Sequence, residues 1–184
     1  MPIFNNEITF IHIPKSGGTT IERFLQSKGY KMSLFTSTGS IFINGHTPQH
    51  CTYRELDELN LLTDRIFTIV RPECERVLSE YFYILEKRPD LKDLFTDFDS
   101  FLELFLDKKN SLLFDNHNLS NKDFLMNSKN EIDGDIKIFD FFEIKKIENF
   151  LNIKGLNNFH ELRTNKIDIT LTKKQISKIK DFYE

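Results

Sequence analysis

The sequence predicts an α/β fold in which a mostly parallel sheet is covered by helices on both faces. Short runs rich in β-branched and aromatic residues occur at residues 7–12, 65–70 and 136–141. A stretch with apolar side chains at helical spacing follows each run. Parallel strands are usually joined through helices, so this alternation favours the α/β class. The 184 residues are expected to form a single domain, residues 1–184.

The first half of the chain alternates strand and helix around short turns. A strand over residues 7–12 is stopped by Pro14 and a glycine pair, and a helix follows over residues 20–26. A second short apolar run at residues 41–44 ends at Gly45. Next come a helix over about residues 53–59, which starts with a capping box of Thr52 and Glu55, and a strand over residues 65–70.

The second half begins with a helix after Pro72, whose apolar stripe includes Val77, Tyr81 and Leu85. The polar, Asn-rich stretch over residues 107–133 is expected to be a long loop with room for one short helix. The other elements are, in order, a helix over residues 98–105, a strand over residues 136–141, a helix over residues 143–151, an irregular stretch to residue 163, and a last helix over residues 176–182 capped by Thr172 and Gln175.

Composition narrows the class of protein. A formal net charge of −3 does not suit a nucleic-acid binder, which usually shows a dominant basic face. Cys51 and Cys74 do not make a metal-type pair, and so few thiols indicate a reducing compartment without a disulfide framework. The chain starts without a secretory signal pattern, and no apolar run approaches the roughly 20 residues that span a bilayer. We therefore expect a cytoplasmic protein with no membrane span.

The loop that follows the first strand has the composition of a phosphate cradle. A glycine pair lets backbone N–H groups turn inward, and the start of the next helix adds donors and a favourable dipole for an anion. Lys15 precedes both glycines, whereas in the Walker A pattern the lysine follows them. A lysine on this side can reach the bridging oxygen of a bound phosphate ester, where charge develops if the ester leaves.

The segment Phe10-Ile11-His12-Ile13-Pro14-Lys15-Ser16-Gly17-Gly18-Thr19-Thr20 resembles the 5′-phosphosulfate loop of sulfotransferases that use 3′-phosphoadenosine-5′-phosphosulfate (PAPS). The branch it resembles includes heparan sulfate 2-O-sulfotransferase and many bacterial enzymes. This resemblance implies a three-layer P-loop-like fold with a mostly parallel central sheet flanked by helices. It implies that Lys15 stabilises the departing phosphate oxygen. The residues it assigns to binding the 5′-phosphate end of PAPS are Lys15, Ser16, Gly17, Gly18, Thr19 and Thr20.

A second pair of residues suits the 3′-phosphate. Arg71 ends the strand over residues 65–70, and Ser79 lies two turns into the following helix, so both can converge on one phosphate. Their spacing resembles the 3′-phosphate motif of the same family, although Pro72 comes one place earlier than in the usual Arg-Asp-Pro sequence. Arg76 also matches a family arginine, and either PAPS binding or an ordinary ion pair would explain it.

Transfer of a sulfuryl group to a hydroxyl needs a base, and imidazole has a suitable pKa. His46 follows Gly45 after a predicted strand, and this pair resembles the glycine-histidine segment that carries the family's proposed base. His50 either assists or is a surface imidazole, and His12 is expected to order the loop. His117 resembles, less closely, a family segment of the form His-x-x-Pro-Gln whose last two residues are changed here.

These observations predict a PAPS-dependent sulfotransferase that acts on a hydroxyl-bearing acceptor, a glycan or a small alcohol. In this prediction His46 is the base, Lys15 stabilises the leaving group, and no metal is required. The oligomeric state is left open. Two alternatives remain: a P-loop kinase, which needs a Lys-Ser or Lys-Thr pair after the glycines and an acidic magnesium ligand, and a nucleotide-binding module without catalytic activity.

Overall fold

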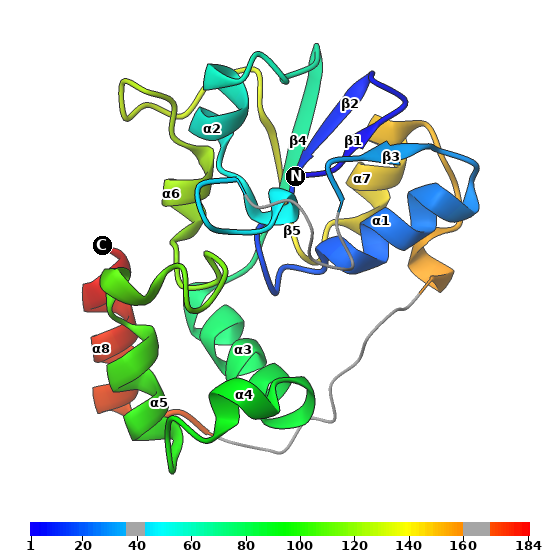
Figure 1. Cartoon of the computed structure of the whole chain (residues 1–184). Helices are drawn as coiled ribbons and strands as arrows, with labels where there is room; N and C mark the ends of the chain where they lie inside the picture. The colour runs from blue at the N-terminus through cyan, green and yellow to red at the C-terminus, as the bar shows by residue number, and fades with distance from the viewer. Residues whose placement is uncertain (36–42, 160–169) are drawn as a thin grey trace.

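The computed structural model describes residues 1–35, 43–159 and 170–184, and it has an α/β fold with a five-stranded mixed sheet (Figure 1). The strand order is β3-β1-β2-β4-β5. The strands are β1 (Ile3–Phe4), β2 (Ile8–Ile11), β3 (Met32–Ser33), β4 (Arg65–Val70) and β5 (Lys137–Asp140). The helices are α1 (Gly18–Ser27), α2 (Tyr53–Glu58), α3 (Glu73–Lys87), α4 (Pro89–Lys92), α5 (Phe98–Phe105), α6 (Asn121–Leu125), α7 (Ile144–Leu151) and α8 (Lys173–Tyr183).

The prediction of a mostly parallel sheet is wrong. Strands β2, β4 and β5 are parallel, but β1 pairs antiparallel with both β2 and β3. The cause is a tight turn: Asn5 and Asn6 both take positive φ, and the Glu7 N–H donates to the Phe4 carbonyl at 2.9 Å. Asparagine tolerates this left-handed conformation, so the chain reverses directly instead of crossing over through a helix. The sequence-based prediction missed β1 and β3.

Most of the longer predicted elements are confirmed. Strand β4 has the predicted bounds, and the predicted capping boxes start α2 and α8. In the stretch predicted to be a second strand, Ile43 makes only an isolated bridge with His46. Residues 41–42 of that strand and residues 160–163 of the predicted irregular stretch lie outside the described residues.

Helices cover both faces of the sheet, as predicted. One face carries Phe10 and Phe67, whose rings stack at 4.8 Å, and packs against α1 and α7. The other face carries Ile11 and Ile66 and packs against α2 and α6. Successive side chains of a strand point to opposite faces, so β2 and β4 contribute to both cores.

A third core lies beyond the end of the sheet, among α3, α4, α5 and α8 (Figure 1). Phe101 is fully buried there, and its ring centre lies 5.0 to 5.9 Å from those of Tyr81, Phe95, Phe98 and Phe105. Helix α3 buries one side in this aromatic core, and polar residues of α3 contact the loop between β2 and α1. None of the helices within the three described ranges is long and apolar enough to cross a membrane.

Candidate active site

The loop predicted to cradle phosphate joins the central strand β2 to helix α1. Lys15 takes a positive φ of 63°, an uncommon conformation for a residue with a side chain. Gly17 follows with φ 84° and occupies the N-cap position of α1, where no described side chain caps the helix. The uncapped start of a helix presents backbone N–H groups and the positive end of the helix dipole, which suit an anion.

Packing accounts for both glycines. A Cβ atom on Gly18 would lie 2.4 Å from the His12 ring, and one on Gly17 would lie 2.8 Å from the Phe141 ring. The position of the His12 ring is fixed by a hydrogen bond from its Nδ1–H to the buried Glu22 carboxylate. His12 therefore orders the loop by supporting Gly18, in keeping with the role expected for it.

The hydroxyl group of Ser16 is unsatisfied as a hydrogen-bonding group. The side chain is buried, and its Oγ has no hydrogen-bond partner among the described residues. A buried hydroxyl without a partner costs free energy, and native structures contain few of them. An anion bound at the start of α1 would give this hydroxyl an acceptor, so the residues present fit a phosphate group.

The side chain of Lys15 lies across an aromatic ring of α3. Its Nζ is 3.8 Å from the centre of the Tyr83 ring, a cation–π contact. Burial, the largest influence, lowers the pKa of Lys15, whereas Glu80 opposes this shift and Arg71 adds to it. The ammonium group is thus held near the loop by an aromatic surface instead of a direct ion pair.

Arg71 links the same loop to α3. One of its guanidinium N–H groups donates to the Lys15 carbonyl at 3.3 Å, and its Nε–H donates to Glu75 at 3.0 Å. Ser79 lies one turn after Glu75 and one turn before Tyr83, so these three residues share one face of α3. The structure therefore brings Lys15, Arg71 and Ser79 to one strip of this helix.

Arg76 is a buried structural residue that crosslinks the site. Its side chain is 3% exposed and pairs with Glu73 at 2.7 Å. It donates to the carbonyls of Pro14 at 3.1 Å, His117 at 3.3 Å and Leu119 at 3.1 Å. Arg76 thus ties two separate loops to α3, which supports the ion-pair explanation of this residue over a direct role in binding.

Three histidine rings lie in a row with each neighbouring pair edge to face, and each histidine is paired with a carboxylate. Adjacent rings are 5.3 Å and 4.6 Å apart between centres. Each carboxylate accepts from an Nδ1–H, so Nε2 is the ring nitrogen that is not bonded to a carboxylate. The pairs are His12 with Glu22, His50 with Asp115 at 2.7 Å and His117 with Glu80 at 2.8 Å. Burial is the main influence on His50 and lowers its pKa to about 3, so His50 is neutral at physiological pH.

Of these pairs, His117 and Glu80 lie beside Tyr83, the residue whose ring Lys15 contacts. The His117 ring centre is 6.3 Å from that of Tyr83, the ring that Lys15 covers. Burial alone would raise the pKa of Glu80, but His117 and Lys15 together lower it, so Glu80 is an ionised carboxylate. Sequence reasoning missed Glu80 and Tyr83. The available signal was an acidic residue inside the apolar stripe of α3, since a charged side chain is rarely buried without a partner.

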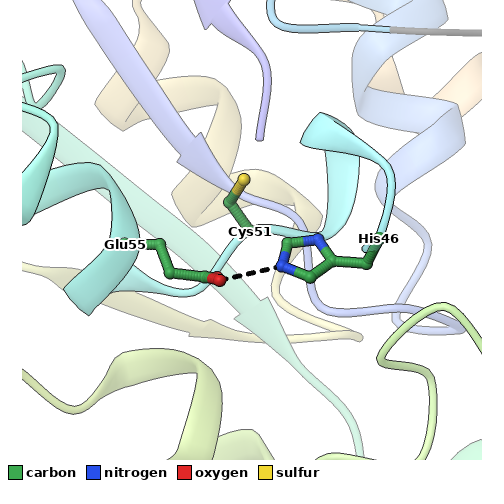
Figure 2. Close-up of side chains that lie close together, drawn as sticks. All are labelled: His46, Cys51 and Glu55. Carbon is green, nitrogen blue, oxygen red and sulfur yellow. Dashed lines mark hydrogen bonds and ion pairs between the residues drawn. The ribbon is translucent and has the colours of Figure 1, made fainter. Parts of the chain in front are cut away.

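His46 faces α2. Its side chain is buried, its Nε2 lies 2.8 Å from Glu55, and its Nδ1 lies 3.0 Å from the Thr47 carbonyl (Figure 2). A carbonyl only accepts, so Nδ1 carries a proton. Burial disfavours the imidazolium, but the hydrogen bonds to Glu55 and Thr47 outweigh it and raise the pKa of His46. Both ring nitrogens are therefore engaged.

Comparison with known proteins adds no relative: no protein-family model, no curated protein and no solved structure matches this chain. The resemblance to sulfotransferases rests on the loop after β2 and on the spacing of Arg71 and Ser79.

Proposed function

We propose that this protein is a sulfotransferase that transfers the sulfuryl group of PAPS to a hydroxyl-bearing acceptor, a glycan or a small alcohol. The observation that carries this proposal is the convergence of Lys15, Arg71 and Ser79 on one strip of α3, beside the uncapped start of α1. One phosphate at the start of α1 beside Lys15, and a second between Arg71 and Ser79, would match the two phosphate groups of the donor. ATP has no 3′-phosphate.

The start of α1 would hold the 5′-phosphosulfate through backbone N–H groups and the hydroxyls of Ser16, Thr19 and Thr20. Arg71 and Ser79 would hold the 3′-phosphate. The present partner of Arg71 is the half-exposed Glu75, and ion pairs of this kind are weak. The guanidinium can therefore exchange this carboxylate for a phosphate at small cost.

The chemistry is an in-line displacement at sulfur. The acceptor oxygen forms a bond to sulfur as the bond between sulfur and the bridging phosphate oxygen breaks. The acceptor proton passes to a base, and the electron pair of the broken bond stays on the 5′-phosphate of the leaving 3′,5′-bisphosphate. Lys15 offsets this developing charge, and positioning supplies much of the rate.

The contacts favour His117 as the base over His46. The Nδ1–H of His117 donates to Glu80, which leaves Nε2 to accept a proton, as in other histidines oriented by a carboxylate. Both ring nitrogens of His46 already form hydrogen bonds, one with the Glu55 carboxylate and one with the Thr47 carbonyl, so neither is free to take the acceptor proton. The prediction from the sequence that His46 is the base stays untested, and we propose His117 in its place.

Calorimetry with 3′-phosphoadenosine-5′-phosphate, without metal, tests the donor site. Arg71→Ala is expected to weaken binding about 10- to 100-fold, because a hydrogen bond to a charged group contributes roughly 1.5–3 kcal/mol. Arg23→Ala, which removes an exposed arginine of α1, is the matched control and should leave the affinity unchanged. Equal affinity in wild type and Arg71→Ala would remove the clamp from the proposal.

Two other outcomes decide between classes of function. Tight binding of ATP with magnesium, and weak binding of the bisphosphate, would indicate a kinase. Tight binding of the bisphosphate without transfer of labelled sulfate to any glycan or alcohol would indicate a nucleotide-binding module.

A further inference from the structure

A second cluster of chemically reactive side chains lies where the segment before α2 meets that helix. One ring nitrogen of His46, Cys51 Sγ and one Glu55 carboxylate oxygen all lie within 4.8 Å of one another. Figure 2 shows His46 and Glu55 pointing toward each other, with Cys51 beside them and its sulfur turned away from the hydrogen bond that joins them. In a tetrahedral zinc site, bonds of about 2.0–2.3 Å place the ligand atoms roughly 3.3–3.8 Å apart. To reach these separations, His46 Nε2 and the Glu55 oxygen, now 2.8 Å apart, would move apart, and Cys51 Sγ would turn toward them.

The chemistry of the three donors suits one metal in particular. Thiolate, imidazole and carboxylate are the three ligand types that zinc takes in proteins, and the thiolate disfavours magnesium and calcium. His46 is 2% exposed and Cys51 is fully buried. Neither needs to be recruited from solvent. The sequence predicts no metal site because the two cysteines are not paired, but here one cysteine is joined by a histidine and a glutamate.

The groups behind these donors already orient them. The Nδ1–H of His46 donates to the Thr47 carbonyl at 3.0 Å, which leaves Nε2 as the nitrogen that faces the cluster. The far oxygen of Glu55 accepts from the Thr52 N–H at 2.8 Å, and its near oxygen accepts from Asn44 at 2.8 Å. Metal ligands in proteins are typically fixed by outer hydrogen bonds of this kind.

We propose that His46, Cys51 and Glu55 bind a zinc ion, with water as the fourth ligand. Binding releases the proton of the Cys51 thiol and the proton on His46 Nε2, and it replaces the hydrogen bond between His46 and Glu55 with two metal bonds. The ion joins the segment before α2 to the helix itself. This site is separate from the proposed sulfotransferase chemistry and does not depend on it.

A neighbouring group of His50, Asp115 and His117 also has metal-binding side chains within 4.8 Å of one another. It fits a metal less well, because the Nδ1–H of His117 is bonded to Glu80, a carboxylate outside the group. It also has no thiolate. This difference gives the experiment a clear readout.

Cobalt(II) titration of the metal-free full chain tests the proposal. We expect one cobalt ion per chain, visible bands of a tetrahedral site and a near-ultraviolet thiolate-to-cobalt charge-transfer band, all removed by one equivalent of zinc. Cys51→Ser should abolish the charge-transfer band. Cys74→Ser, which alters the other cysteine, and His117→Ala should leave the spectrum unchanged.

A second variant keeps the test decisive if Cys51→Ser does not fold. Glu55→Gln keeps the capping box of α2, because glutamine also serves at this position. It should keep the charge-transfer band but weaken zinc binding by at least about 10-fold. A folded wild type without a thiolate band, a band that is lost in Cys74→Ser or His117→Ala, or zinc affinity equal in wild type and Glu55→Gln would each overturn the proposal.

Discussion

At the residue scale, paired side chains define the candidate site more than isolated ones. Lys15 is held by Tyr83, Arg71 by Glu75 and His117 by Glu80. A base that is oriented by a carboxylate has one nitrogen free in a known direction, which a lone histidine does not. This pairing makes the role of each histidine testable by substitution.

The kinetic prediction compares two histidines. His117→Ala should lower kcat for sulfuryl transfer by about 10²- to 10⁴-fold, the usual contribution of a positioned base. The affinity for 3′-phosphoadenosine-5′-phosphate should not change, because in the proposed mechanism His117 acts on the acceptor and not on the donor. Steady-state kinetics with labelled PAPS provide the measurement.

His46→Ala is the comparison, since its ring faces α2. If this variant lost the larger share of kcat while staying folded, the base would be His46. Glu80→Gln, which keeps the shape of the side chain, should also lower kcat and alter the pH profile, as expected of a positioning residue.

The pH prediction concerns the buried pair of Glu22 and His12. Burial alone would raise the pKa of Glu22, but His12 and Gln49 together lower it below its model-peptide value of 4.5. A carboxyl whose pKa is lowered on folding contributes stability that is present above pH 4.5 and is lost as the pH falls through the folded pKa.

The stability of the wild type should therefore fall on acidification below pH 4.5, and the stability of Glu22→Gln should fall less over the same interval. Urea midpoints measured between neutral and acidic pH give both slopes. Parallel slopes for the two proteins would mean that other carboxyl groups cause the loss.

At the element scale, the loop between β2 and α1 is shaped by its neighbours as well as by its own residues. The His12 ring occupies the space beside Gly18, and Phe141 lies against Gly17. Arg76 of α3 holds the Pro14 carbonyl at 3.1 Å. The start of α1 is thus supported from three sides, which keeps its N–H groups in place for an anion.

A glycine substitution tests this support. In Gly18→Ala the new methyl group would lie 2.4 Å from the buried His12 ring, so the ring must move. We expect a loss of unfolding free energy of about 1–3 kcal/mol, as for other overpacked sites. Urea denaturation provides the measurement.

Gly134→Ala is the matched control, because no atom lies within 4 Å of its Cβ position. Its stability should stay close to that of the wild type. A Gly18→Ala protein as stable as Gly134→Ala would show that the loop is not held against His12.

At the scale of the whole molecule, three hydrophobic cores position the elements that carry the candidate site. Two of them clamp the faces of the sheet, and the third joins α3, α4, α5 and α8. Helix α3 belongs to the third core through Tyr81 and Ile84 and carries Ser79, Glu80 and Tyr83 of the site. The aromatic core therefore helps to set where these three residues lie relative to the sheet.

Removing the ring at the centre of that core should affect the molecule globally. Phe101→Ala is expected to lower the unfolding free energy by about 3–5 kcal/mol, since the ring is fully buried among other aromatic side chains. Phe142→Ala, at a side chain that is 71% exposed, should change stability by less than about 0.5 kcal/mol. Similar denaturation midpoints for the two variants would contradict this account of the core.

The sequence by itself determined several local elements. Strand β4, the capping boxes of α2 and α8 and the turn after β2 were predictable, because each depends on residues a few positions apart, although α1 begins at Gly18, inside the predicted loop. Periodicity, capping and turn chemistry act over this short range. The family resemblance uses the same local spacing.

Only the tertiary structure decided which side chains meet. His117 and Glu80 are 37 positions apart, and His46 turned out to face Glu55 on α2. The Asn5-Asn6 turn that pairs β1 with β2 is a local signal, but the pairing of β1 with β3 joins Ile3 to Ser33, 30 positions along the chain. Such contacts depend on the path of the whole chain and on which groups must find partners once buried, and no short window of the sequence holds that information.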